Sequence, residues 1–170
     1  MGLSDEELWD CLSQVSDPEI PVISIIDLGI VRAIERREDG RCEIVITPTY
    51  SGCPAMHVIE AHIRQALEDR GAENIEIRTQ LSPAWTTDWM SNAGKEKLRA
   101  FGIAPPAQRA ENTLGTIDIS ALMLTKDVDI ACPQCASMNT RLISQFGSTA
   151  CKALYRCGDC LEPFDYFKPH

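Results

Sequence analysis

Residues 41–67 read RCEIVITPTYSGCPAMHVIEAHIRQAL, and the hydrophobic pattern changes its period in the middle of this stretch. The first part alternates two sets of residues, Cys42, Ile44 and Ile46 on one side and Glu43, Val45 and Thr47 on the other. A period of two is typical of a strand with one buried face. After Pro54 apolar residues return at helical spacing, and Gly71 follows as a C-terminal cap. The stretch predicts a strand, a loop that holds Cys53, and a helix of about four turns.

The segments on either side of this unit share its mixed character. Ser4 and Glu7 form a capping box in front of an amphipathic helix. Residues 30–36 are rich in β-branched residues, and a turn with a glycine joins them to the strand 41–47. Residues 74–79 form a third short strand. The order helix, strand, strand, helix, strand predicts an α+β fold in which helices cover a small mixed sheet.

The next part of the chain holds two tryptophans, Trp85 and Trp89, beside a proline. They fit either a core cluster under a loop or an anchor for a partner, and the core interpretation is favoured. A short helix follows and ends by Gly102, after which Pro105-Pro106 open a stretch without a strong period. We therefore expect three parts: an N-terminal domain over residues 1–103, a connecting segment over 104–130 and a C-terminal module over 131–170.

Composition and charge narrow the class of protein. Of the 170 residues 44% are hydrophobic, which supplies a folded core and excludes a disordered chain. The formal net charge is −9, whereas nucleic-acid backbones attract basic surfaces, so no nucleic-acid partner is expected. No apolar run approaches the ~20 residues that span a bilayer, and the acidic N-terminus does not resemble a signal peptide. We expect a cytoplasmic protein with no membrane partner.

Two Cys-x-x-Cys pairs lie near the C-terminus, Cys132 with Cys135 and Cys157 with Cys160. The spacing within each pair lets both thiolates bend toward one ion, and two such pairs form the tetrahedral sulfur site that zinc prefers. The 21 residues between the pairs provide two strands of a zinc ribbon, 140–146 and 152–156. A module of 40 residues is at the lower size limit for folding alone, so structural zinc is expected to hold it together. Iron is the alternative metal, because it also accepts four thiolates.

The charge of the C-terminal module bears on its partners. Residues 131–170 carry four basic and three acidic side chains, a net charge of +1, whereas the rest of the chain carries −10. Zinc with four thiolates contributes −2, which takes the module to about −1. A nucleic-acid-binding ribbon, a further alternative, is therefore disfavoured.

Cys53 is the most informative of the remaining cysteines, whereas Cys11, Cys42 and Cys151 fit buried packing positions. It lies between a glycine and a proline at the start of the predicted helix. Backbone N–H groups and the positive end of the helix dipole favour a thiolate at such a place. That thiolate can bind a soft metal, bind a cluster or act as a nucleophile, and spacing alone does not choose among these.

Three segments of the chain resemble the SufT-like family of iron–sulfur cluster assembly proteins. They are Asp17-Pro18-Glu19-Ile20-Pro21, Asp27-Leu28-Gly29 and the segment from Thr47 to Ser51-Gly52-Cys53-Pro54. Later motifs resemble the PaaD family, also called PaaJ, of bacterial phenylacetate degradation. These are Ser82-Pro83-Ala84-Trp85-Thr86-Thr87-Asp88-Trp89, the two cysteine pairs, Phe146-Gly147-Ser148-Thr149-Ala150-Cys151-Lys152 and Pro163-Phe164-Asp165-Tyr166-Phe167. The resemblance covers nearly the whole chain.

The resemblance implies a protein that accompanies the phenylacetyl-CoA epoxidase, a multicomponent di-iron monooxygenase with a flavin and iron–sulfur reductase. It implies help in making or maintaining the metal centres of that complex. The implied partners are the epoxidase components, including the iron–sulfur reductase, and a homo-oligomer stays open. The chain lacks the carboxylate–histidine helix motif of a di-iron site and the glycine-rich loop of a dinucleotide site, which argues against catalysis of its own.

The same resemblance implies a role for individual residues. Cys53 transiently ligates iron or an iron–sulfur cluster. Asp17 and Glu19 come near it to shape the site or to hand iron on, and Thr47 and Thr49 hold the loop by hydrogen bonds. The two cysteine pairs bind structural zinc. One thiol cannot enclose a cluster, so a labile cluster needs a dimer, a client protein or a small thiol as co-ligand.

Two other classes of function stay open. The chain could be an enzyme that uses Cys53 as a nucleophile, for example on a thioester. It could also be a structural or catalytic subunit of the oxygenase.

Overall fold

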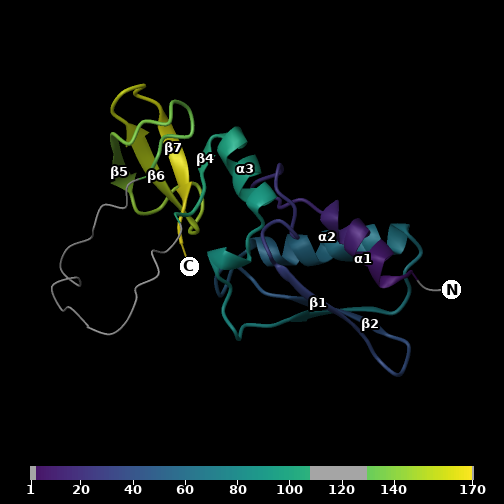
Figure 1. Ribbon diagram of the computed structural model, residues 1–170. Coiled ribbons are helices and arrows are strands. Elements are labelled where there is room, and N and C mark those ends of the chain that lie inside the picture. The colour runs from purple at the N-terminus through teal and green to yellow at the C-terminus, as the bar shows by residue number, and fades with distance from the viewer. Residues whose placement is uncertain (1–2, 108–129, 170) are drawn as a thin grey trace, which may run out of the picture. The chain divides into compact units, whose positions relative to one another are not determined.

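The computed structural model describes residues 3–107 and 130–169, which fold as two units (Figure 1). The first unit extends to Phe101, and the second from Gly102 to Pro169. Most of the predicted connecting segment, residues 108–129, lies outside the described residues. No helix of the described residues is long and apolar enough to cross a membrane.

The first unit combines helices with a three-stranded sheet. In chain order its elements are α1 (Asp5–Ser13), β1 (Val31–Arg36), β2 (Cys42–Ile46), α2 (Ala55–Asp69), β3 (Ile75–Thr79), the 3₁₀ helix η1 (Thr87–Trp89) and α3 (Asn92–Phe101). The strand order is β1-β2-β3, with β1 antiparallel and β3 parallel to β2. This is the expected mixed sheet, and the predicted α+β fold class is confirmed.

The helices of this unit begin and pack as the sequence indicates. Ser4 and Glu7 form the predicted capping box at the start of α1. α1 packs on α2, where the Cys11 Sγ lies 3.1 Å from the carbonyl oxygen of Ala66. The core contains fully buried side chains from α1, α2 and β2: Leu8, Leu12, Ile59, Ile63, Leu67, Ile44 and Ile46. Cys11 and Cys42 are buried, as predicted.

Strand β2 departs from the predicted alternation, because all five of its residues are buried. Glu43, expected on the outer side, is 4% exposed, and its carboxylate accepts hydrogen bonds from Arg37 and Arg78. Burial acts to raise the pKa of Glu43, but the two guanidinium groups outweigh this effect and lower it. Arginine side chains thus pack at a face of β2 that the alternation of the sequence predicts to be exposed to solvent.

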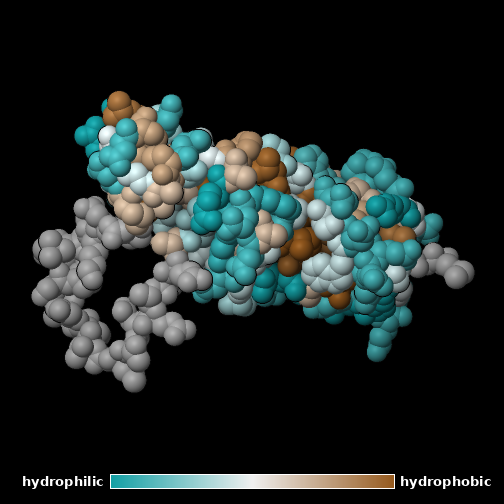
Figure 2. Space-filling model, turned by 45° about the horizontal axis from the view of Figure 1, so that its top comes forward, coloured by the Kyte–Doolittle hydropathy of each residue, from teal (hydrophilic) through white to brown (hydrophobic). Residues whose placement is uncertain are grey.

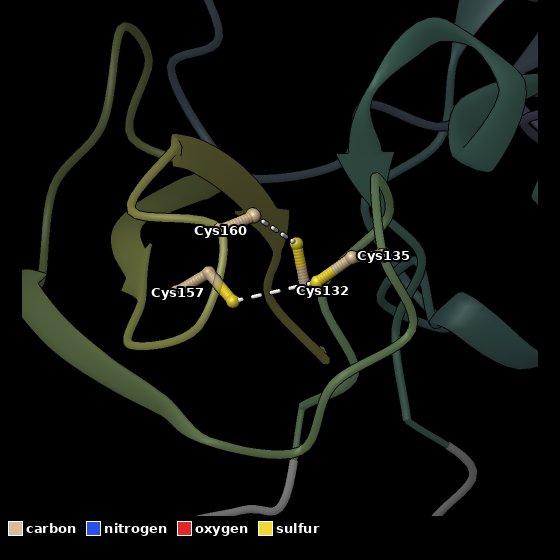
Figure 3. Close-up of side chains that lie close together, drawn as sticks. All are labelled: Cys132, Cys135, Cys157 and Cys160. Carbon is tan, nitrogen blue, oxygen red and sulfur yellow. Dashed lines mark hydrogen bonds between the residues drawn. The ribbon is translucent and has the colours of Figure 1, made fainter.

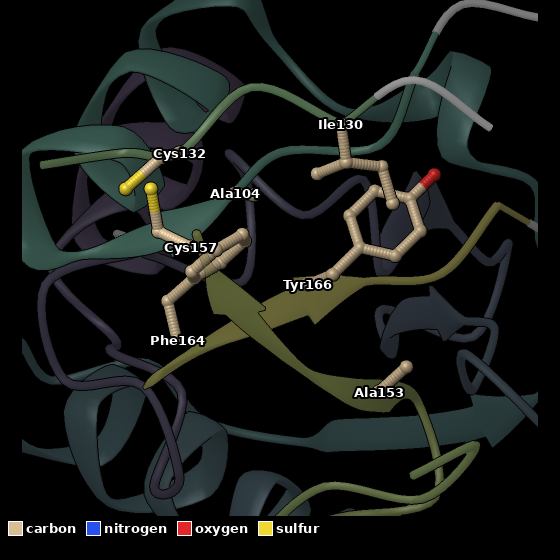
Figure 4. Close-up of a cluster of buried hydrophobic side chains, with 7 residues drawn as sticks. All are labelled: Ala104, Ile130, Cys132, Ala153, Cys157, Phe164 and Tyr166. Carbon is tan, nitrogen blue, oxygen red and sulfur yellow. The ribbon is translucent and has the colours of Figure 1, made fainter. Parts of the chain in front are cut away.

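The second unit is a four-stranded sheet. Its strands are β4 (Ile103–Ala104), β5 (Thr140–Ser144), β6 (Lys152–Cys157) and β7 (Pro163–Phe167), in the spatial order β4-β7-β6-β5. β5 and β6 confirm the predicted hairpin, whereas β4 and β7 were not predicted. Figure 4 shows Phe164 and Tyr166 of β7 in the core together with the buried cysteines Cys132 and Cys157. The cysteine cluster and the hydrophobic core are therefore continuous.

Candidate metal centre and cysteine loop

The four cysteines of the two pairs meet at one point of the second unit (Figure 3). Their Sγ atoms all lie within 4.8 Å of one another. Cys132 and Cys160 are 3.7 Å apart, and Cys135 and Cys157 are 3.6 Å apart, measured between Sγ atoms. A tetrahedron with Zn–S bonds of about 2.3 Å has ligand sulfurs about 3.8 Å apart. The donor set and its spacing therefore fit a four-coordinate metal ion.

The two cysteine pairs lie in similar turns. The backbone N–H of Cys132 donates to the carbonyl oxygen of Ser137 (2.9 Å), and that of Cys157 donates to the carbonyl oxygen of Glu162 (3.0 Å). Ala136 and Leu161 adopt positive φ angles of 61° and 66°. Such angles are uncommon outside glycine, and both occur four residues after the first cysteine of a pair. The turns therefore present both pairs of thiols to one ion in the same way.

Polar contacts join the two turns. The Asp159 carboxylate accepts hydrogen bonds from the Ser137 hydroxyl and from Asn139 Nδ2, the latter at 2.8 Å. The Gly158 N–H donates to the carbonyl oxygen of Asn139 (2.6 Å). A Cβ on Gly158 would lie 2.5 Å from Asn139 Nδ2, so a side chain at this position would require the Asn139 amide to move away from Asp159.

The backbone around the second pair favours a thiolate. The N–H of Cys160 lowers the pKa of Cys157 to about 6, against the effect of burial. The N–H of Glu162 acts in the same direction on Cys160, but burial and the neighbouring thiols raise the pKa of Cys160 to about 12. The opposite directions belong to one group of interacting thiols, and a metal ion bound there would take all four as thiolates.

Cys53 lies where the loop after β2 enters α2. Its N–H donates to the carbonyl oxygen of Tyr50 (3.2 Å), and Gly52 has a φ of +85°, which favours glycine. Pro54 is the N-cap residue of α2 and provides no side-chain cap. Cys53 is half-buried. The thiol is thus partly accessible at a helix start, where the first backbone N–H groups have no partner inside the helix.

Thr47 is buried at the end of β2, where the cysteine loop begins. It is 1% exposed, and its Oγ1 is buried without a hydrogen-bond partner in the part of the chain that the structure describes. The role of Thr47 in holding the loop by hydrogen bonds stays a prediction. The backbone holds this position, because the Thr47 N–H donates to the carbonyl oxygen of Ile30 (2.8 Å). Thr49 is half-buried, and its role stays a prediction.

A hollow of about 450 Å³ lies beside the same loop. Its walls are residues 47–51 together with Leu81, Ala84 and Trp85. The sequence could not reveal it, because about thirty residues separate the two segments that form it. No charged side chain lines the hollow, which therefore suits an uncharged group.

Asp17 and Glu19 lie in the loop after α1. Asp17 is buried, and its Oδ1 accepts hydrogen bonds from the N–H groups of Glu19 (2.9 Å) and Ile20 (2.8 Å). The carboxylate thereby shapes its own turn. Glu19 is exposed. The approach of these two residues to Cys53 stays a prediction.

Asp27 connects the middle of the first unit to α3. Its Oδ1 accepts a hydrogen bond from the Ser91 hydroxyl (2.7 Å), and its Oδ2 from the Lys97 ammonium (2.6 Å) and the Ser24 hydroxyl (3.1 Å). Burial acts to raise the pKa of Asp27, but these hydrogen bonds outweigh burial and lower it. Asp27 is therefore ionised and structural at neutral pH.

The two tryptophans pack around Leu28 and Gly29. Trp85 is 4% exposed, and its Nε1 donates to the carbonyl oxygen of Leu28 (2.9 Å), which confirms the core interpretation for this residue. Gly29 has a φ of +70°, and a Cβ there would lie 2.4 Å from the Trp89 carbonyl oxygen. The Arg32 guanidinium lies 3.5 Å from the centre of the Trp89 ring, a cation–π contact.

Two family models match the chain. Residues 5–77 match the iron–sulfur cluster assembly protein family, and residues 118–168 match the PaaD zinc beta ribbon domain. These matches coincide with the mixed sheet and with the four-thiol cluster. The chain is therefore a protein of the class in which an iron–sulfur cluster assembly domain is followed by a zinc ribbon.

Relatives narrow this class. A protein of Escherichia coli (strain K12), provisionally named as one of the subunits of 1,2-phenylacetyl-CoA epoxidase, is 49% identical over 162 residues, covering 95% of this chain and 91% of that protein. The Fe-S protein maturation auxiliary factor YitW of Bacillus subtilis (strain 168) is 36% identical over 94 residues, 55% of this chain and 91% of that factor. A crystal structure of the domain of unknown function DUF59 from Bacillus anthracis has a TM-score of 0.51 at 28% identity, over 55% of this chain and 90% of that one. The chain belongs to the PaaD family, and the resemblance inferred from the sequence is confirmed.

Proposed function

We propose that the chain is an accessory protein of aerobic phenylacetate degradation that assists the maturation of metal centres in the phenylacetyl-CoA epoxidase. The names of the two relatives support both halves of this statement, the epoxidase and iron–sulfur maturation. The observation that carries it is the half-buried Cys53 thiol at the start of α2, inside the domain that matches the assembly family. The proposed location is the cytoplasm.

In this proposal iron or an iron–sulfur cluster is cargo, and Cys53 holds it transiently. A thiolate is a soft ligand that suits iron. Asp17 and Glu19 are proposed to assist transfer, and Thr49 to hold the loop. One cysteine supplies one of the several ligands that a cluster needs, so the client protein supplies the others. Partial exposure of Cys53 allows that exchange.

We further propose that the four-thiol cluster holds structural zinc. Cys132 and Cys157 belong to the hydrophobic core of the second unit, so an ion bound to them closes that core at one end. Such an ion stabilises the ribbon without taking part in the chemistry at Cys53. The ribbon is then available to dock an epoxidase component.

The test of the proposed function is a Cys53→Ser strain. The substitution keeps nearly the same volume at a half-buried site, so the melting temperature and the zinc content should be unchanged. Cells should make the epoxidase subunits normally but accumulate complex that lacks iron and activity. Iron and a cluster donor added in vitro should restore that complex. Ser51→Ala, an exposed neighbour in the same loop, is the matched control and should behave as wild type.

The other functions predict different results for the same strain. A nucleophilic Cys53 predicts an epoxidase that is fully metallated and yet inactive. A structural subunit predicts no effect of Cys53→Ser on either iron or activity. Normal iron content in epoxidase purified from the Cys53→Ser strain would refute the maturation proposal.

A further inference from the structure

Two arginines face each other on neighbouring strands of the ribbon unit. The register of β5 and β6 pairs Arg141 directly with Arg156. Like charges in directly opposed positions destabilise a sheet. Within residues 130–169 neither guanidinium group forms an ion pair with a carboxylate. The pair therefore has a cost for the fold that no described acidic group offsets.

The two arginines line a hollow of about 330 Å³. The other lining residues are Asn139, Cys157, Gly158 and Leu161. The Arg156 Nε donates to the carbonyl oxygen of Leu161 (3.2 Å), which fixes this side chain and leaves its terminal nitrogens for another acceptor. Leu161 is 59% exposed and gives the hollow an apolar rim. Figure 2 shows hydrophilic and hydrophobic atoms side by side on the surface of this unit.

The neighbouring four-thiol cluster does not account for the arginines. Among the described residues neither guanidinium group forms a hydrogen bond with a thiol of the cluster, whose Sγ atoms lie against one another. The Asn139 amide is already bound to Asp159, at 2.8 Å. The terminal nitrogens of the two guanidinium groups are therefore donors of the hollow that have no described acceptor.

We propose that Arg141 and Arg156 form a binding site for a phosphate monoester. Two guanidinium groups match the charge of about −2 that a phosphate monoester carries at neutral pH, whereas one carboxylate would neutralise only half of theirs. The planar donor forks of arginine suit phosphate oxygens. The hollow exceeds a phosphate group in volume, and the Leu161 rim can contact the organic part of the ligand. The ligand is a free phosphorylated small molecule or a phosphorylated side chain of a partner. This site is independent of the proposed role of Cys53.

The experiment uses the full chain loaded with zinc and measures binding by calorimetry. The probes are AMP, adenosine, inorganic phosphate, a phosphoserine peptide, and the same peptide with glutamate in place of phosphoserine. AMP and phosphate should bind, whereas adenosine should not. If the phosphoserine peptide binds more tightly than AMP, the source of the phosphate is a phosphorylated protein. If AMP binds more tightly, the source is a small molecule.

Variants test the assignment of the two arginines. Arg141→Gln and Arg156→Gln should each weaken AMP binding at least about tenfold, because charge-assisted hydrogen bonds are lost. Arg141→Lys, which keeps the charge but not the fork, should weaken binding less. Lys168→Gln removes one charge elsewhere on the ribbon and should change affinity less than about twofold. Zinc content should stay the same in all variants.

Four results would overturn the proposal. They are no binding of any phosphate probe at millimolar concentration, equal binding of the glutamate peptide and the phosphoserine peptide, an equal effect of Lys168→Gln and Arg141→Gln, and loss of zinc in the arginine variants. The last result would assign the arginines to the metal cluster. None of these results bears on the iron content of epoxidase from the Cys53→Ser strain, so the two proposals fail separately.

Discussion

Replacing Thr47 with valine should stabilise the first unit, although most substitutions of buried residues destabilise. The Thr47 Oγ1 is buried without a partner among the described residues, and leaving a polar group in that state costs about 1–3 kcal/mol. Valine has nearly the same shape and no polar atom, so Thr47→Val should raise the free energy of unfolding by about 1–2 kcal/mol. In a unit of about 100 residues each kcal/mol corresponds to a rise in Tm of about 4–8 °C.

Tryptophan fluorescence during urea unfolding measures this change for the first unit alone. The three tryptophans of the chain, Trp9, Trp85 and Trp89, all lie in that unit. Ser24→Ala is the control, because the Ser24 hydroxyl donates to Asp27 and accepts from the Asp27 N–H, and its loss should destabilise by about 1 kcal/mol. If Thr47→Val destabilises the unit as Ser24→Ala does, the Thr47 hydroxyl has a partner in solution and the reasoning fails.

Three further predictions concern the remaining structural features. Gly29→Ala should cost about 3–5 kcal/mol, because a positive φ costs about 1–2 kcal/mol and the new Cβ would lie 2.4 Å from the Trp89 carbonyl oxygen. Gly40→Ala, with a φ of +84° and no atom within 4 Å of the new Cβ, should cost only the about 1–2 kcal/mol of the positive φ. Equal losses of unfolding free energy for the two variants, measured in urea, would contradict this. Asp27→Asn should destabilise by about 1–2 kcal/mol at pH 7. Since the folded-state pKa of Asp27 is lowered, its stabilisation is complete above about pH 4 and is lost progressively as the pH falls through the folded-state pKa, so a difference that does not shrink below about pH 4 would argue against this origin. Cys157→Ala should lose the bound metal and make residues 131–170 sensitive to protease while residues 1–100 stay folded; full metal occupancy by elemental analysis would count against the cluster.

The features that local patterns encode were predictable, and those that depend on distant segments were not. The capping box at Ser4 and the two cysteine pairs follow from spacing alone, and both are present in the structure. Strand β7 carried a signal, because Phe164 and Tyr166 alternate with polar residues and both are buried. The local sequence held no signal for the burial of Glu43, because that burial depends on Arg78 from another strand. The partnerless hydroxyl of Thr47 likewise depends on what surrounds it in three dimensions.

The motifs shared with the SufT-like family divide by whether packing explains them. Packing accounts for Gly29, since any side chain there would collide with Trp89, and hydrogen bonds to α3 account for Asp27. Packing accounts for less of the cysteine loop: a Cβ on Gly52 would meet no atom within 4 Å, so only its φ of +85° favours glycine, and Cys53 is only half-buried. A segment that contributes little to packing, and that leaves a thiol accessible at a helix start, is where chemistry is expected. This contrast supports the proposal that Cys53 holds the cargo, whereas Asp27 and Gly29 belong to the scaffold that holds the domain together.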